Sequence, residues 1–158
     1  MKKKYKFSKF DMILIENFVF SICEDIKVKK SKQWLCDQDE QIVYIGTKAP
    51  SKTNEYFIQW FKNQNYGIDT DINIISLLHE IGHIMSGFDS EKIEERAKLN
   101  NLYVFLQSQG AINVKEMNYN YYEIPEEKSA TEWGVNYYKN HQEQCEKLAE
   151  DLGLYNLE

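Results

Sequence analysis

The segment from Ile72 to Met85 constrains this fold more than any other part of the chain. Apolar residues lie on several of its sides, so it predicts a helix that is buried at the centre of a domain. Asp69 or Asp71 is placed to cap its start, and Ser86 and Gly87 mark its end.

The remaining segments predict further helices and one β-hairpin around this centre. Apolar residues recur at three- and four-residue spacing over residues 10–26, which is typical of an amphipathic helix. Two short runs, residues 33–36 and 41–45, flank a polar turn and predict a hairpin. Further helices are expected over residues 54–63, over residues 90–107, and from Pro125 towards Leu152, whereas residues 113–123 show no period. The helix over residues 90–107 is expected to hold its apolar residues over a charged exposed face: Ile93, Ala97, Leu102, Val104, Phe105 and Leu106.

Composition favours a single α+β domain. A chain of 158 residues is long enough for one domain of about 150 residues. Only 2 prolines and 7 glycines favour long helices over a turn-rich β-sandwich. We therefore expect one mostly helical domain over residues 1–158, in which a small hairpin-based sheet packs on a bundle of helices.

Charge and cysteine content narrow the possible partners and compartments. The net charge is −6 and Arg96 is the single arginine, which argues against nucleic-acid binding and favours a protein partner or peptide substrate. Cys23, Cys36 and Cys145 are too few and too far apart for a disulfide framework, as expected for a cytoplasmic protein. Cys36 and Cys145 are predicted to be packed side chains. No apolar run approaches the roughly 18 residues of a membrane span, so no membrane association is expected.

The central helix contains the string His79-Glu80-Ile81-Gly82-His83, which has the pattern HExxH. Residues four apart on a helix lie about 40° apart in rotation and about 6 Å apart along the axis, so His79 and His83 can bind one Zn²⁺ ion from the same face. Glu80 lies about 100° round from His79, where it can miss the metal and act on a zinc-bound water as general base. The pattern predicts a zinc site with Glu80 as the catalytic residue.

A catalytic zinc ion needs a third protein ligand, and Glu127 is the first candidate. In the helix that begins at Pro125, Glu127 shares a face with Ala130 and Gly134, two small residues that would allow a close approach to the zinc helix. Gly82 supports this arrangement. A glycine inside a helix costs about 1 kcal/mol relative to alanine, and a close approach of a neighbouring backbone is the simplest reason for it.

Other residues remain candidates for the third ligand. Glu126 is less well aligned than Glu127, and Glu132 points about 140° away from it. Asp89 stands where metzincins place their third ligand, with Met117-Asn118-Tyr119 faintly like a Met-turn, although the glycine that should precede it is displaced by one position. His141 is the remaining histidine and is expected to be exposed. The tyrosines Tyr119, Tyr121 and Tyr122 are expected to serve mainly in packing, with an oxyanion donor among them as the alternative.

The HExxH string and the segment that begins at Pro125 together resemble the ImmA/IrrE family of small cytosolic metallopeptidases. The family pattern is HExxH followed by a glutamate, two residues, an alanine and then an aromatic residue. Thr131 stands where the family has Asn or Asp, and Gly134 where it has Ala, which suggests a divergent branch. The resemblance covers residues 72–139, and the matching residues are His79, Glu80, His83, Glu127, Ala130 and Trp133.

The resemblance implies a zincin-like fold with a gluzincin-like glutamate ligand. It also implies a zinc-dependent endopeptidase that cleaves a specific protein, such as a helix-turn-helix transcriptional repressor from a mobile element. The alternative is a zinc-stabilised interaction module that binds a regulator without cutting it. Glu80 argues against that alternative, because a structural zinc site has no use for a base and is normally closed by four protein ligands.

Overall fold

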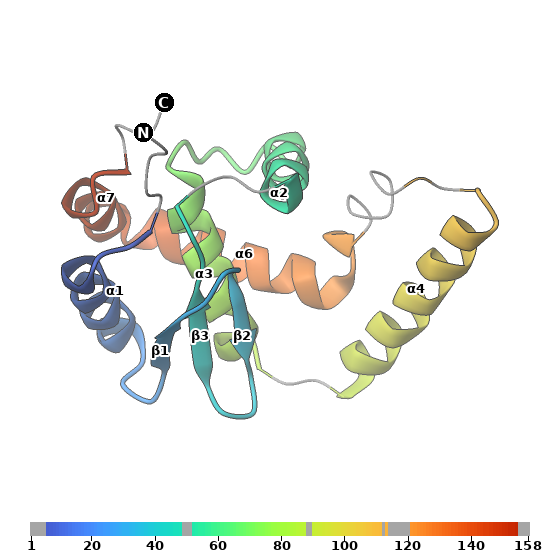
Figure 1. Cartoon of the computed structure of the whole chain (residues 1–158), viewed down its shortest axis with the longest axis horizontal. Helices are drawn as coiled ribbons and strands as arrows, with labels where there is room; N and C mark the ends of the chain where they lie inside the picture. The colour runs from blue at the N-terminus through green and yellow to red at the C-terminus, as the bar shows by residue number, and fades with distance from the viewer. Residues whose placement is uncertain (1–5, 49–51, 88–89, 112, 114–120, 155–158) are drawn as a thin grey trace.

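The computed structural model describes residues 6–48, 52–87, 90–111, 113 and 121–154. These residues form an α+β fold that is mostly helical, with one small mixed sheet (Figure 1). Within this part of the chain, no helix combines the length and the apolar composition needed to cross a membrane. In chain order the elements are α1 (Lys9–Ile22), β1 (Lys27–Lys30), β2 (Leu35–Asp37), β3 (Ile42–Ile45), α2 (Lys52–Asn63), α3 (Ile72–Met85), α4 (Ser90–Ser108), α6 (Pro125–Asn140) and α7 (Gln142–Asp151).

Helix α3 has the predicted bounds and lies at the centre of the fold. The side chain of Asp71 accepts a hydrogen bond from the backbone N–H of Asn73, which caps the helix as expected. Every residue from Asn73 to His83 is buried, because α6 covers one side of α3 and strands β2 and β3 cover another. The prediction of a buried central helix is confirmed.

The sheet contains the predicted hairpin and one strand that the sequence did not predict. Strands β2 and β3 pair antiparallel, with Cys36 opposite Val43, so the hairpin is confirmed. Strand β1 pairs parallel to the other edge of β3, with Val28 also opposite Val43. Strand β1 contains three lysines and one apolar residue, Val28, and it forms because β3 offers it a free edge for backbone hydrogen bonds.

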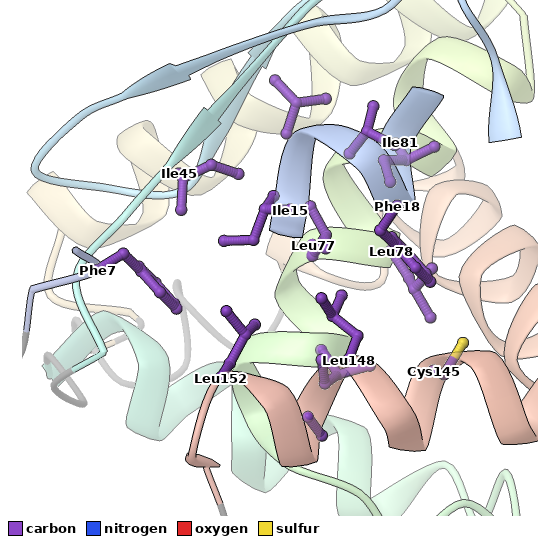
Figure 2. Close-up of a cluster of buried hydrophobic side chains, with 14 of the residues drawn as sticks. Phe7, Ile15, Phe18, Ile45, Leu77, Leu78, Ile81, Cys145, Leu148 and Leu152 are labelled. Atoms are coloured by element: carbon purple, nitrogen blue, oxygen red, sulfur yellow. The ribbon is translucent and has the colours of Figure 1, made fainter. Parts of the chain in front are cut away.

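The main hydrophobic core joins elements from both ends of the chain. Ile15 of α1, Ile45 of β3, Leu77 of α3 and Leu148 of α7 all belong to this cluster (Figure 2). A second cluster, mostly aromatic, lies between α2, α3 and α6 and includes the fully buried Trp60. Helix α3 contributes to both clusters, so it is held from two sides.

The C-terminal segment differs from the single helix expected from Pro125 towards Leu152. It forms two helices, because His141 leaves helical geometry at φ −134° and ψ 38°. The backbone N–H of His141 donates to the carbonyls of Tyr137 and Tyr138 and so closes α6. The turn lets α7 pack Leu148 against α1 and α3, which a straight continuation of α6 would not do.

Two other helices also differ from expectation. Helix α1 ends at Ile22 rather than at residue 26, with Cys23 as its C-cap. Helix α4 has the expected bounds to within one residue, but it does not bury its apolar residues as predicted: Leu102, Val104 and Phe105 are 48%, 61% and 59% exposed. The reason is that α4 contacts mainly α6 and lies on the far side of it from the main core (Figure 1).

Candidate metal centre

Two histidines of α3 form one half of the candidate metal centre. His79 and His83 are one turn apart and both are buried, at 6% and 7% exposure. Their Nε2 atoms lie 3.2 Å from each other. The four-residue spacing on one helix therefore brings both imidazoles to a single point, as the sequence predicted.

Glu127 of α6 completes the centre. Its Oε2 atom lies 3.1 Å from the Nε2 atoms of both His79 and His83, and its side chain is almost fully buried. Among the described residues, these three form the one group of His, Cys, Asp or Glu side chains arranged to hold a metal ion. The structure thus brings together the three residues that were predicted as ligands.

Small residues at the crossing of α3 and α6 make this meeting possible. A Cβ atom added to Gly82 would lie 2.2 Å from the backbone oxygen of Ala130, which is closer than Cβ atoms in real structures come to a non-bonded atom. One added to Gly134 would lie 3.0–3.2 Å from atoms of Leu78. The two backbones are therefore nearly in contact, and Glu127 lies one turn before Ala130 on the approaching face.

Thr131 orients the imidazole of His79. The Thr131 hydroxyl donates to the backbone oxygen of Glu127 at 3.1 Å, so it accepts from Nδ1–H of His79 at 2.8 Å. With its proton on Nδ1, His79 could offer the lone pair of Nε2 to a metal ion in place of the contact with Glu127. Hydrogen bonds of this kind commonly fix the tautomer of metal-binding histidines.

The other ring nitrogen of His83 is buried and, among the described residues, has no hydrogen-bond partner. Its nearest carboxylate is that of Glu126, with 3.8 Å between Nδ1 and Oε1. The side chain of Gln38 spans this region, because its Nε2 donates to Oε1 of Glu126 at 3.2 Å and to the backbone oxygen of His83 at 3.1 Å. Glu126 and Gln38 thus lie on the side of His83 that faces away from Glu127.

Tyrosines surround the other side of Glu127. The Tyr121 hydroxyl donates to Oε1 of Glu127 at 2.7 Å, which leaves Oε2 to the histidines. Tyr122 packs in the aromatic cluster beside Phe57 and Trp60, in agreement with a packing role. Tyr119 lies outside the described residues.

Charges within the centre shift the pKa values of its members. Burial alone would raise the pKa of Glu127, but hydrogen bonds and charge from the two histidines hold it well below its usual range. Burial alone would lower the pKa of His83, but the hydrogen bond to Glu127 and the charges of Glu127, Glu80 and Glu126 raise it. A positive charge is therefore favoured next to the ionised Glu127, and in the metal-free centre His83 is the group that carries it more readily.

Glu80 lies beside the centre without belonging to the group of three. Burial raises its pKa, while the nearby His79 and His83 act in the opposite direction. The thiol of Cys36 on β2 lies close enough to feel the charge of this carboxylate. Burial and the negative charges of Glu80 and Glu127 raise the pKa of that thiol, so Cys36 stays protonated at neutral pH.

The other candidate ligands have different roles or lie outside the description. Glu132 is exposed, as predicted from its direction on α6. His141 is exposed at the junction of α6 and α7, where its ring stacks on Tyr137, so it is not a ligand. Asp89 and residues 117–119 lie outside the described residues. Sequence reasoning missed Gln38, because this residue belongs to no recognisable motif.

Comparison of the chain with models of protein families, with curated proteins and with solved structures finds no match.

Proposed function

We propose that this protein is a zinc-dependent endopeptidase with a zincin-like arrangement of its active site. The observation that carries the proposal is the convergence of two histidine Nε2 atoms and one glutamate oxygen within 3.2 Å of each other. Two His and one Glu form a known ligand set of catalytic zinc, whereas structural zinc sites are usually closed by four protein ligands. The described residues provide three, which leaves one coordination position for water or substrate.

The donor atoms fit a zinc ion. The Thr131 hydrogen bond leaves Nε2 of His79 free to bind a cation, and Tyr121 occupies the second oxygen of Glu127. His79, His83 and Glu127 would hold the ion. When bound, zinc supplies Lewis acidity that lowers the pKa of a water molecule to about 7 and polarises a peptide carbonyl.

Glu80 is the residue of this chain that moves protons in the proposed reaction. Its carboxylate is buried next to both histidines but is not one of the three ligands. It accepts the proton of the attacking water and then delivers it to the nitrogen of the leaving amine. This assignment rests on the position of Glu80 on α3, one residue after His79.

The substrate class follows from the resemblance to the ImmA/IrrE family, and we propose a cytoplasmic transcriptional repressor with a helix-turn-helix domain. The net charge of −6 favours a protein over nucleic acid as the molecule recognised. Incubation with zinc and candidate repressors should yield fragments that disappear when a chelator is added. A stable complex without fragments would instead identify a zinc-stabilised binding module and contradict the proposal.

The variant Glu80→Gln should bind zinc with unchanged stoichiometry but lose cleavage, because the amide cannot accept the proton. General acid–base catalysis contributes about 10²- to 10⁴-fold, so a loss of at least about 100-fold in kcat is expected. Metal content is measured by elemental analysis and cleavage by the appearance of fragments. Glu132→Gln, on an exposed face of α6, is the matched control and should leave both unchanged. Full activity of Glu80→Gln would refute the role of Glu80.

Zinc affinity should rise with pH through the range where His83 loses its proton. The pKa of His83 is raised in the metal-free protein, and zinc binds only the neutral imidazole, so below this pKa a proton must be displaced. Glu127 is already ionised because its pKa is lowered, so it adds no proton to the exchange. Where one proton is displaced, the affinity should increase about tenfold per pH unit and then level off.

This dependence can be measured by competition with a chromophoric chelator at several pH values. The variant His141→Ala removes the remaining histidine and should give the same profile, because His141 is exposed and away from the centre. An affinity independent of pH between about 5 and 8 would show that metal binding displaces no proton from His83 and would contradict this prediction.

A further inference from the structure

The imidazole of His83 has one nitrogen that the three-ligand group does not use. Its Nε2 atom faces Glu127 at 3.1 Å, but its Nδ1 atom is buried and has no hydrogen-bond partner in the part of the chain that the structure describes. When Nε2 binds a metal ion, the neutral ring carries its proton on Nδ1. A buried N–H donor without an acceptor is unfavourable, and metal-binding histidines usually donate this hydrogen to a carboxylate, a carbonyl or a water molecule.

Glu126 has a carboxylate at this position. Its Oε1 atom lies 3.8 Å from Nδ1 of His83, which is longer than a hydrogen bond, and a shift of about 1 Å would form one. The two side chains are only 7% and 11% exposed. Glu126 directly precedes Glu127 in the first turn of α6, so the same crossing of α6 and α3 brings one carboxylate to each nitrogen of the ring.

The side chain of Gln38 keeps this carboxylate beside the ring. Gln38 directly follows β2, and its amide group has two hydrogens. It donates to Oε1 of Glu126 at 3.2 Å and to the backbone oxygen of His83 at 3.1 Å. The amide therefore joins the hairpin to both helices of the metal centre, and it holds the same oxygen atom that faces Nδ1. A carboxylate oxygen can accept two hydrogen bonds, so the bond from Gln38 leaves room for one from His83.

We propose that Glu126 accepts the Nδ1–H of His83 when the centre holds a metal ion, and that Gln38 positions the carboxylate for this bond. Both are positioning residues, because they act on the metal only through His83. Helix α6 then orients both imidazoles, through Thr131 at His79 and through Glu126 at His83. The inference rests on the metal binding of the proposed function and does not require that the protein cuts a substrate.

Nuclear magnetic resonance of the zinc-loaded protein with isotope-labelled histidine tests the hydrogen bond directly. The Nδ1–H of His83 should give a downfield signal that exchanges slowly with water. Glu126→Ala should move this signal upfield and speed its exchange, and Gln38→Ala should do so to a smaller extent. The signal of His79, whose partner is Thr131, should stay in place. If Glu126→Ala leaves both ring signals unmoved, the inference is overturned. If Gln38→Ala leaves them unmoved, the role of Gln38 is wrong.

Zinc affinity, measured by competition with a chromophoric chelator at one fixed pH, tests the consequence for the metal. Glu126→Ala should lower the affinity by about 10- to 100-fold, the usual effect of losing such a partner. Glu126→Gln loses the charge but keeps an oxygen that can accept the hydrogen, so it should recover most of the affinity. Glu132→Ala, on the exposed side of α6, is the matched control and should bind zinc as the wild type does. Equal losses in Glu126→Ala and Glu126→Gln would contradict the hydrogen bond, because charge alone would then explain them.

The outcomes separate this inference from the proposed function. If the wild-type protein binds zinc and cuts its substrate while the Glu126 variants keep its ring signals and affinity, the inference is wrong and the proposed function stands. If the zinc-loaded wild type shows the expected signals but cuts nothing, the endopeptidase function fails and the inference stands. A wild type that binds no zinc would contradict both. Should Glu126→Ala fail to fold, Glu126→Gln preserves the volume and should still move the His83 signal upfield, since a neutral amide is a weaker acceptor than a carboxylate.

Discussion

Replacing Gly82 with alanine should destabilise the protein by about 3 kcal/mol, although alanine is the better helix former by about 1 kcal/mol. The new Cβ would lie 2.2 Å from the backbone oxygen of Ala130, and 2.9 Å from its carbonyl carbon. These are backbone atoms, so no side chain can rotate away to make room. Helices α3 and α6 would have to separate, which also moves Glu127 away from the two histidines.

Thermal and denaturant unfolding of the metal-free protein measure this effect. Gly134→Ala is the graded comparison, because its Cβ would meet Leu78 at 3.0–3.2 Å and a shift of a few tenths of an ångström would relieve the contact. Its cost should be clearly smaller than that of Gly82→Ala. A Gly82→Ala variant with an unchanged or higher Tm would show that the two helices do not cross as closely as the structure places them.

Replacing Glu127 with glutamine should lower zinc affinity by at least about 100-fold. Even hydrogen-bond partners of metal ligands change affinity by about 10- to 100-fold when mutated, and Glu127 is proposed as a ligand itself. The substitution keeps the volume of the side chain but removes the negative charge that both Nε2 atoms face at 3.1 Å. Cleavage should be lost together with the metal.

The matched control is Glu132→Gln, which makes the same chemical change on the exposed side of α6. It should leave zinc affinity unchanged, as measured by chelator competition. Asp89→Ala tests the metzincin-like alternative in the same assay and should also leave affinity unchanged. Loss of zinc binding in Asp89→Ala but not in Glu127→Gln would reverse the ligand assignment and remove the support for the family resemblance.

Local sequence determined the central helix and the ligands placed on it. The apolar residues, the cap at Asp71 and the absence of proline define α3 without reference to any other element, and the bounds agree with the structure. The geometry of His79 and His83 follows from helix spacing alone. Glu127 could be chosen over Glu132 for the same reason, since small residues mark the face of α6 that can approach another helix.

Tertiary structure decided what surrounds those ligands. Strand β1 forms because β3 offers a free edge, and its own lysines give no pattern that predicts it. The break at His141 likewise allows α7 to pack on α1. Neither glycine nor proline marks that position, so the sequence does not predict the break.

Gln38 reaches the backbone oxygen of His83 only after the hairpin has packed on α3. A helical motif can be recognised from one segment because hydrogen bonds within that segment determine its geometry. Contacts between a strand and a helix that are far apart in the chain depend on which surfaces pack together. The spacing of residues within one segment does not predict that packing.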